Sequence, residues 1–124
     1  MSDWKTPLRL VEQLDKKGNI HEKGVKKLVS AVAEASELGE KLGCAEFIAF
    51  ATSAVRSAPN SEAVLDEVEK QTGVRLQILS GVEEAQLTFL AARRWYGWSA
   101  GRITNLDIGG GLLGRWSELL PRRR

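Results

Sequence analysis

One long helix dominates the hydrophobic pattern in the first half of the chain. From about His21 to Leu42, apolar residues recur three or four positions apart, which gathers side chains on one face of a helix. The apolar positions are Val25, Leu28, Val29, Val32, Ala35, Leu38 and Leu42. Gly43 follows them, where a helix terminator is expected. The segment therefore predicts an amphipathic helix that buries one face.

A strand, a loop and a second helix are predicted next. Residues 45–51 are short and mostly apolar, as in a buried strand, and residues 52–56 leave this strand as a loop. The second helix begins around Asn60 or Ser61, either of which suits the capping position. Gly73 ends this helix because glycine readily adopts the left-handed conformation of a C-terminal cap.

The last three elements continue the alternation. Residues 74–79 alternate apolar and polar side chains, as in a half-covered strand. Ser80 and Glu83 fit a capping box that opens a helix running to about Trp95. Residues 102–108 indicate a final strand. Strands separated by helices of crossover length favour an α/β fold with parallel pairing and helices on the sheet faces.

Composition and charge narrow the class of protein without choosing a function. The chain has 124 residues, 43% apolar and 27% charged, which fits one small globular domain. A formal net charge of +2 gives no argument for nucleic acid or a membrane as a partner. Without a secretory signal pattern or an apolar run near ~20 residues, we expect a cytoplasmic protein. Cys44, the single cysteine, is expected to be buried in a reducing compartment.

Three further segments have weaker patterns. Residues 8–11 are compatible with a short strand before a polar turn at residues 15–19. Basic and aromatic residues alternate in residues 93–98, which suits stacking on bases. A helix end whose arginines offset the dipole and whose rings pack on neighbours is the favoured interpretation. The three arginines at residues 122–124 are interpreted as a solvated tail.

Candidate chemistry lies at strand ends and helix starts, where ligands bind in open parallel sheets. Ser53 and Arg56 follow the first strand and offer a hydroxyl and a guanidinium to a phosphate, although an ordinary polar turn has the same composition. Glu84 lies in a first helical turn, where the dipole favours its ionised form. An ionised carboxylate in a cleft can activate a water, and the alternative is a solvent-facing glutamate.

A glycine triplet after the final strand is the third candidate. Asp107 ends this strand and is suited to holding a divalent cation, directly or through water. Gly109, Gly110 and Gly111 would let backbone N–H groups approach phosphate oxygens closely. The alternative is a turn after a strand without any ligand.

Three motifs occur together and in order: residues 51–56, residues 78–85 and residues 107–111. In this combination the chain resembles the Ppx/GppA family of exopolyphosphatases and guanosine pentaphosphate phosphohydrolases, and residues 87–98 are similar to its actinobacterial members. The resemblance covers about residues 8–111 and implies part of an actin/Hsp70/sugar-kinase-like domain. It also implies removal of a terminal phosphate from inorganic polyphosphate or guanosine pentaphosphate with Mg²⁺, and it allows dimers among full-length relatives.

The resemblance implies a role for each candidate residue. Glu84 matches the catalytic glutamate that activates water, and Arg56, with Ser53 nearby, matches a loop that faces the substrate phosphates. Asp107 matches the aspartate that assists metal and water. Gly109, Gly110 and Gly111 match a phosphate loop. These roles require that the turn with Arg56, the helix start with Glu84 and the glycine triplet meet at one edge of a parallel sheet.

Two departures from the family pattern qualify the expectation of activity. The family has a strand and an Asp-x-Gly-Ser-type loop upstream, which we do not find after Met1. Its Gly-Gly-Gly-Ser-x-Glu loop is also interrupted here by Leu112, Leu113 and Gly114. We therefore expect residues 1–111 to be an incomplete first actin-like domain and residues 112–124 a divergent tail, disordered or frame-shifted.

Little or no phosphatase activity is the expectation for the chain as written. The alternatives are a non-catalytic fragment that binds phosphate or a partner chain, and a fragment that folds poorly because its sheet leaves edges unpaired.

Overall fold

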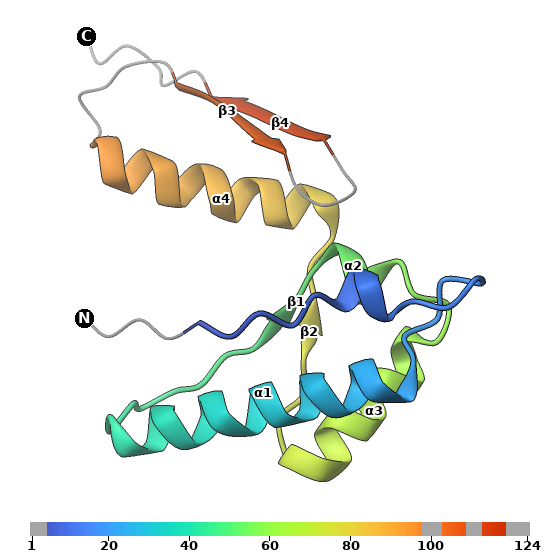
Figure 1. The fold of residues 1–124 in the computed structure, drawn as a ribbon. Coiled ribbons are helices and arrows are strands. Elements are labelled where there is room, and N and C mark those ends of the chain that lie inside the picture. The colour runs from blue at the N-terminus through green and yellow to red at the C-terminus, as the bar shows by residue number, and fades with distance from the viewer. Residues whose placement is uncertain (1–4, 98–102, 109–112, 119–124) are drawn as a thin grey trace, which may run out of the picture. The chain divides into compact units, whose positions relative to one another are not determined.

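The chain divides into two compact units in the computed structural model, which describes residues 5–97, 103–108 and 113–118. The first unit is Met1–Ile78 and the second is Leu79–Arg124. Figure 1 shows the elements of each unit along the chain. The first unit contains η1 (Leu10–Gln13), α1 (Glu22–Lys41), β1 (Phe50–Ala51), α2 (Ser53–Arg56), α3 (Ser61–Thr72) and β2 (Gln77–Ile78). The second contains α4 (Gly81–Tyr96), β3 (Ile103–Ile108) and β4 (Leu113–Glu118).

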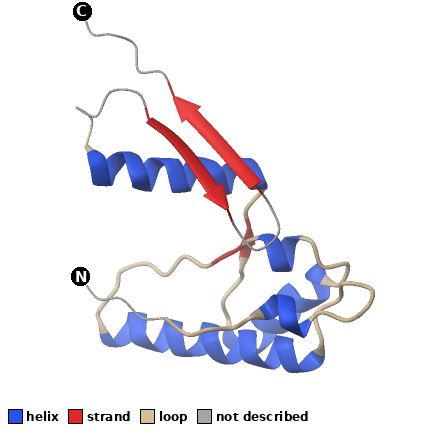
Figure 2. Cartoon of the chain, turned by 45° about the horizontal axis from the view of Figure 1, so that its top comes forward, coloured by secondary structure: helices blue, strands red, loops and turns tan. Residues whose placement is uncertain are grey.

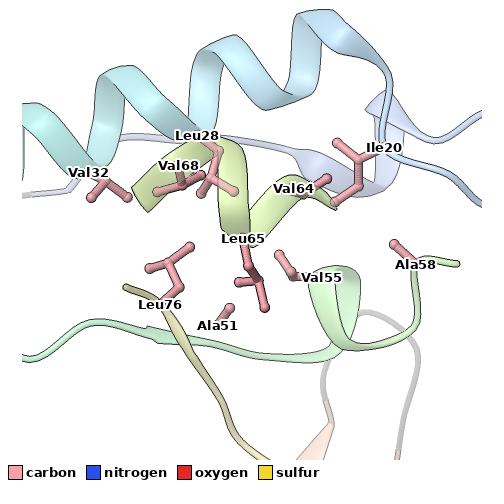
Figure 3. Close-up of a cluster of buried hydrophobic side chains, with 10 residues drawn as sticks. All are labelled: Ile20, Leu28, Val32, Ala51, Val55, Ala58, Val64, Leu65, Val68 and Leu76. Carbon is pink, nitrogen blue, oxygen red and sulfur yellow. The ribbon is translucent and has the colours of Figure 1, made fainter. Parts of the chain in front are cut away.

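The predicted amphipathic helix is confirmed as α1, whose buried face packs on α3. Leu28 and Val32 of α1 lie against the side chains of α3, and the core continues to β1, α2 and β2 (Figure 3). Val68 is fully buried in this cluster. The other members of the core are Ile20, Ala51, Val55, Ala58, Val64, Leu65 and Leu76. Burial of apolar area by two helices and the strand segments is what holds the first unit together.

The helix α3 begins and ends as predicted, but the side chain of its N-terminal asparagine forms different hydrogen bonds from those expected of a cap. Asn60 occupies the capping position without a capping hydrogen bond from its side chain. Its Oδ1 instead accepts from the Ile20 N–H at 2.9 Å, and its Nδ2 donates to the Ile20 carbonyl at 3.0 Å. Gly73 ends the helix with φ 73°, the left-handed conformation that favours glycine. Asn60 therefore ties the start of α3 to the residue before α1.

The first two predicted strands are present but short. β1 and β2 pair in parallel, with Phe50 opposite Gln77 and Ala51 opposite Ile78. Both were predicted over six or seven residues. They are reduced to two because a strand is defined only where a neighbouring backbone completes its hydrogen bonds. Phe47, Ile48 and Phe50 consequently remain exposed. The parallel direction agrees with the predicted α/β arrangement.

The second unit packs a helix on two antiparallel strands (Figure 2). The strand predicted over residues 102–108 is confirmed as β3, which pairs with β4. Ile103 lies opposite Glu118 at one end of the pairing, and Ile108 lies opposite Leu113 at the other. Residues 113–118 fall in the segment expected to be a divergent tail, disordered or frame-shifted, and they form the strand β4, which is at odds with disorder in this segment. Strand pairing in this unit also departs from the all-parallel prediction. A short connection between strands suffices for antiparallel pairing, whereas parallel strands need a crossover.

Three local predictions are wrong for physical reasons. The possible strand at residues 8–11 is replaced by η1, which begins after Arg9 in a left-handed conformation. Cys44 is exposed rather than buried, because it follows α1 outside the packed faces. Arg93 and Arg94 lie in the last turn of α4, as predicted for arginines that offset the helix dipole. Arg93 is also buried, with its guanidinium carbon 5.7 Å from the centre of the Phe89 ring. Trp95 and Tyr96 are 86% and 69% exposed, so they do not pack on neighbours as expected.

Candidate functional site

The turn that carries Ser53 and Arg56 is helical rather than a loop. β1 ends at Ala51, and the short helix α2 begins directly after Thr52. The Arg56 N–H donates to the Thr52 carbonyl at 3.0 Å, which closes this turn. Ser53 and Arg56 are three residues apart and therefore share one side of the helix, where both are half-buried. The hydroxyl and the guanidinium are thus positioned together by a strand end.

An apolar hollow of about 330 Å³ adjoins α2 within the first unit. Thr52 and Ser53 are its hydroxyl-bearing lining residues, and Arg56 is not among the residues that line it. The remaining lining residues are apolar and come from the N-terminal segment, α1, the segment that ends in β1, α2 and Leu76, which precedes β2. This hollow offers few groups for a phosphate, so the phosphate-binding prediction depends on the Arg56 side of α2.

The first turn of α4 has the predicted capping box. The Glu83 N–H donates to Ser80 Oγ at 3.2 Å, and the Ser80 N–H donates to Glu83 Oε2 at 2.8 Å. The Ser80 backbone N–H, followed by the Ser80 hydroxyl, holds the pKa of the Glu83 carboxyl below its ordinary value. The capping box therefore engages the Glu83 carboxylate at the N-terminus of α4.

Glu84 is the second carboxylate of this helix start, and it takes no part in the capping box. It is half-buried, whereas Glu83 is exposed. Its N–H donates to the Ser80 carbonyl at 2.9 Å, and its carbonyl accepts from Thr88 Oγ1 at 2.9 Å. Adjacent helical residues point about 100° apart, so Glu83 and Glu84 do not form a carboxylate pair on one face. The backbone of Glu84 is thus held firmly in the first turn of α4.

The last motif lies partly outside the described residues. Asp107 occupies the penultimate position of β3, with Gly114 of β4 as its register partner. Gly109, Gly110 and Gly111 are outside the residues that the structure describes. Across the described side chains, no three His, Cys, Asp or Glu residues gather as metal ligands. These side chains alone do not build a magnesium site, and the Mg²⁺ requirement stays a prediction.

The structure brings Ser53 and Arg56 together and places Glu84 and Asp107 on neighbouring elements of the second unit. Ser53 and Arg56 share one helical turn in the first unit. In the second unit, Glu84 and Asp107 stand on α4 and β3, which pack on each other. The meeting of all the motifs at one sheet edge remains a prediction. Among the described residues, no helix has the length and apolar character needed to cross a membrane.

Proteins of known sequence and of known structure are similar to this chain. Over 113 residues the chain is 59% identical to "Exopolyphosphatase 1" of Mycobacterium leprae, covering 91% of this chain and 33% of that protein. The chain therefore spans about a third of the length of the curated relatives it matches.

Solved structures agree on the fold. The crystal structure of an exopolyphosphatase from Cytophaga hutchinsonii superposes with a TM-score of 0.81 at 21% identity, covering 95% of this chain and 41% of that chain. The Aquifex aeolicus Ppx/GppA family member gives a TM-score of 0.77 at 21% identity, with 90% of this chain and 36% of that chain covered. These superpositions confirm the predicted α/β, actin-like fold class. Since the model of the Ppx/GppA phosphatase family also matches residues 1–113, nine-tenths of the sequence, the chain belongs to that family.

Proposed function

We propose that this chain carries part of the active site of an exopolyphosphatase, which hydrolyses the terminal phosphoanhydride bond of inorganic polyphosphate. Family membership supports the reaction class, and the mycobacterial relatives named as exopolyphosphatases support polyphosphate over guanosine pentaphosphate as substrate. Glu84 would act as the general base, Arg56 and Ser53 as phosphate ligands, and Asp107 with Gly109, Gly110 and Gly111 as the metal and phosphate loop.

The parallel register of β1 and β2 is the observation that carries this proposal. Ala51 and Ile78 are register partners, so both strands end at the same edge of their sheet. After β1 the backbone enters α2. After β2 it reaches Ser80 and then the first turn of α4. In parallel sheets this edge is where ligands bind, because loops and helix N-termini converge there. The register therefore supports placing the turn with Ser53 and Arg56 at the edge of the sheet where ligands bind.

The chemistry of these residues suits phosphoryl transfer, in which positioning and charge neutralisation do most of the work. The Arg56 guanidinium would offer two parallel N–H donors to phosphate oxygens, and the Ser53 hydroxyl would add a third. The Glu84 carboxylate would orient the attacking water and accept its proton, while the shortened polyphosphate chain leaves. When bound, Mg²⁺ would neutralise charge on the phosphate oxygens.

Turnover by this chain is expected to be low. Leu112 and Gly114 stand where the family has a hydroxyl and a second carboxylate after the glycine triplet, so neither polar group is present in this chain. Loss of one preorganised polar group commonly lowers a catalytic rate by ~10²–10³-fold. The competing function is a module that retains polyphosphate without cleaving it.

The test measures phosphate release from long-chain polyphosphate with Mg²⁺, alongside retention of the polyphosphate by the protein. Glu84→Gln should lower the rate by ~10²-fold or more, since it removes the general base but not the shape. Glu83→Gln is the matched control, because glutamine still fits the capping box and the rate should be kept. A chelator should also stop release.

Two further results would decide between the functions. Arg56→Ala should weaken retention, whereas Arg94→Ala, at an exposed arginine of α4, should not. Retention without any release in the unmodified chain would favour the binding module. Equal rates for Glu84→Gln and the unmodified chain would refute the proposed base.

A further inference from the structure

A hollow lined by three lysines lies beside the first half of α1, within the first unit. It measures about 420 Å³ and is bounded by residues 6–8 on one side and by α1 on the other. Lys23, Lys26 and Lys27 line it together with Ser30. Residues three and four apart on a helix are neighbours on its surface, so the ammonium groups form one cluster. The hollow is therefore a compact basic surface.

The lysines differ in how far their charge is already neutralised. Lys26 forms an ion pair with Glu22 at 2.8 Å on the helix surface. Lys23 and Lys27 make no ion pair within 4.0 Å across the part of the chain that the structure describes. Glu34 is the one carboxylate among the described residues that line the hollow. Two exposed positive charges one helical turn apart are thus left for an anion from solution.

The lining favours phosphate oxygens over other anionic groups. Ammonium groups bind anions as point charges without a fixed orientation, and the hydroxyls of Thr6 and Ser30 add hydrogen-bond donors. None of the described residues that line the hollow is aromatic. Single-stranded nucleic acid is generally held by stacking of its bases on aromatic rings, so this surface is better suited to a polyanion without bases.

We propose that this lysine hollow is a second binding site for inorganic polyphosphate, separate from the residues assigned to hydrolysis. The proposal rests on the proposed function for the identity of the ligand. A single exposed ion pair contributes little, but a linear polyanion engages several lysines at once and gains from their proximity. The site would hold an internal stretch of a long chain and would bind a single phosphate weakly.

The experiment measures binding of fluorescently labelled long-chain polyphosphate to the full 124-residue chain by anisotropy, at low and at high salt. The double substitution Lys23→Gln with Lys27→Gln should weaken binding between about twofold and about thirtyfold, as two exposed ion pairs would. It should also reduce the salt dependence. Lys→Arg at both positions should keep the affinity, because the charge is preserved.

Matched controls separate this site from a general effect of charge. Lys41→Gln with Lys70→Gln removes the same two charges from positions outside the hollow and should leave the affinity within about twofold. Glu22→Gln should strengthen binding, since it releases Lys26 from its ion pair. Equal losses for the two double variants would overturn the proposal, as would a Glu22→Gln variant with weaker binding.

The same measurements distinguish this proposal from the proposed hydrolysis. Glu84→Gln should bind long-chain polyphosphate as the unmodified chain does, and Lys23→Gln with Lys27→Gln should cleave saturating polyphosphate at the unmodified rate. If polyphosphate binding depends on Lys23 and Lys27 but the chain never releases phosphate, the result would refute the proposed hydrolysis and support the second site. Single-stranded RNA or anionic vesicles that bind more tightly than polyphosphate, with the same lysine dependence, would overturn the choice of ligand.

Discussion

Two glycines of α1 should respond in opposite directions to the same substitution. Gly24 is buried near the start of the helix and Gly39 lies near its end. Replacing a helical glycine by alanine commonly gains up to ~1 kcal/mol, because alanine loses less backbone freedom on folding. Whether the substitution stabilises the protein depends on the space that the structure leaves for the added methyl group.

A methyl group at Gly24 would meet atoms that cannot easily move. An ideal Cβ would lie 2.8 Å from Gln13 Cβ and 2.9 Å from Ile20 Cγ2. Gln13 Cβ is fixed to the backbone of η1, and Ile20 is 3% exposed in the core. Overpacking of this kind costs ~1–3 kcal/mol, so Gly24→Ala should lower the free energy of unfolding by about 1–2 kcal/mol net. At Gly39 the nearest atom is Phe47 Cδ2 at 3.5 Å, an ordinary contact, and the substitution should stabilise.

Urea unfolding of the 124-residue chain, followed by circular dichroism of its helices, measures both effects. With a slope near ~1 kcal/mol per molar urea, the midpoint should fall by about 1 M or more for Gly24→Ala and rise for Gly39→Ala. A Gly24→Ala variant as stable as Gly39→Ala would refute the close approach of η1 to α1.

Two other substitutions test the connections described above. Asn60→Ala should destabilise the first unit by about 1–3 kcal/mol, because the N–H and the carbonyl of Ile20 both lose their hydrogen-bond partner. In the same urea titration, the control Gln71→Ala on the exposed side of α3 should change the free energy of unfolding by less than about 0.5 kcal/mol. The lowered pKa of Glu83 predicts a stabilising contribution that is present above the ordinary carboxyl range and is lost as the pH falls through the folded-state pKa. Thermal melts of the unmodified chain and of Glu83→Gln should therefore converge as the pH is lowered, and a gap that widens towards acid would contradict the capping role.

The sequence by itself determined the local structure wherever a residue type strongly favours one local conformation or one local hydrogen bond. The spacing of Leu28 and Val32 predicted α1, Gly73 predicted the end of α3, and Ser80 with Glu83 predicted the capping box. These features depend on residues close along the chain, whose geometry is set by helix periodicity and by backbone conformation. The family motifs also pointed to Arg56, predicted in a loop after a strand, and to Glu84, predicted in the first turn of a helix.

Only the tertiary structure decided features that depend on residues far apart in the sequence. Strand length depends on which backbone lies alongside, so β1 and β2 shortened to their paired residues and the segment 113–118 became a strand opposite β3. Asn60 was predicted as a cap but binds Ile20, a contact forty residues distant. The lysines of α1 are visible in the sequence as polar positions, whereas their hollow exists because residues 6–8 pass beside them. The periodicity of the sequence predicts which face of a helix is apolar, whereas tertiary packing determines which residues contact that face.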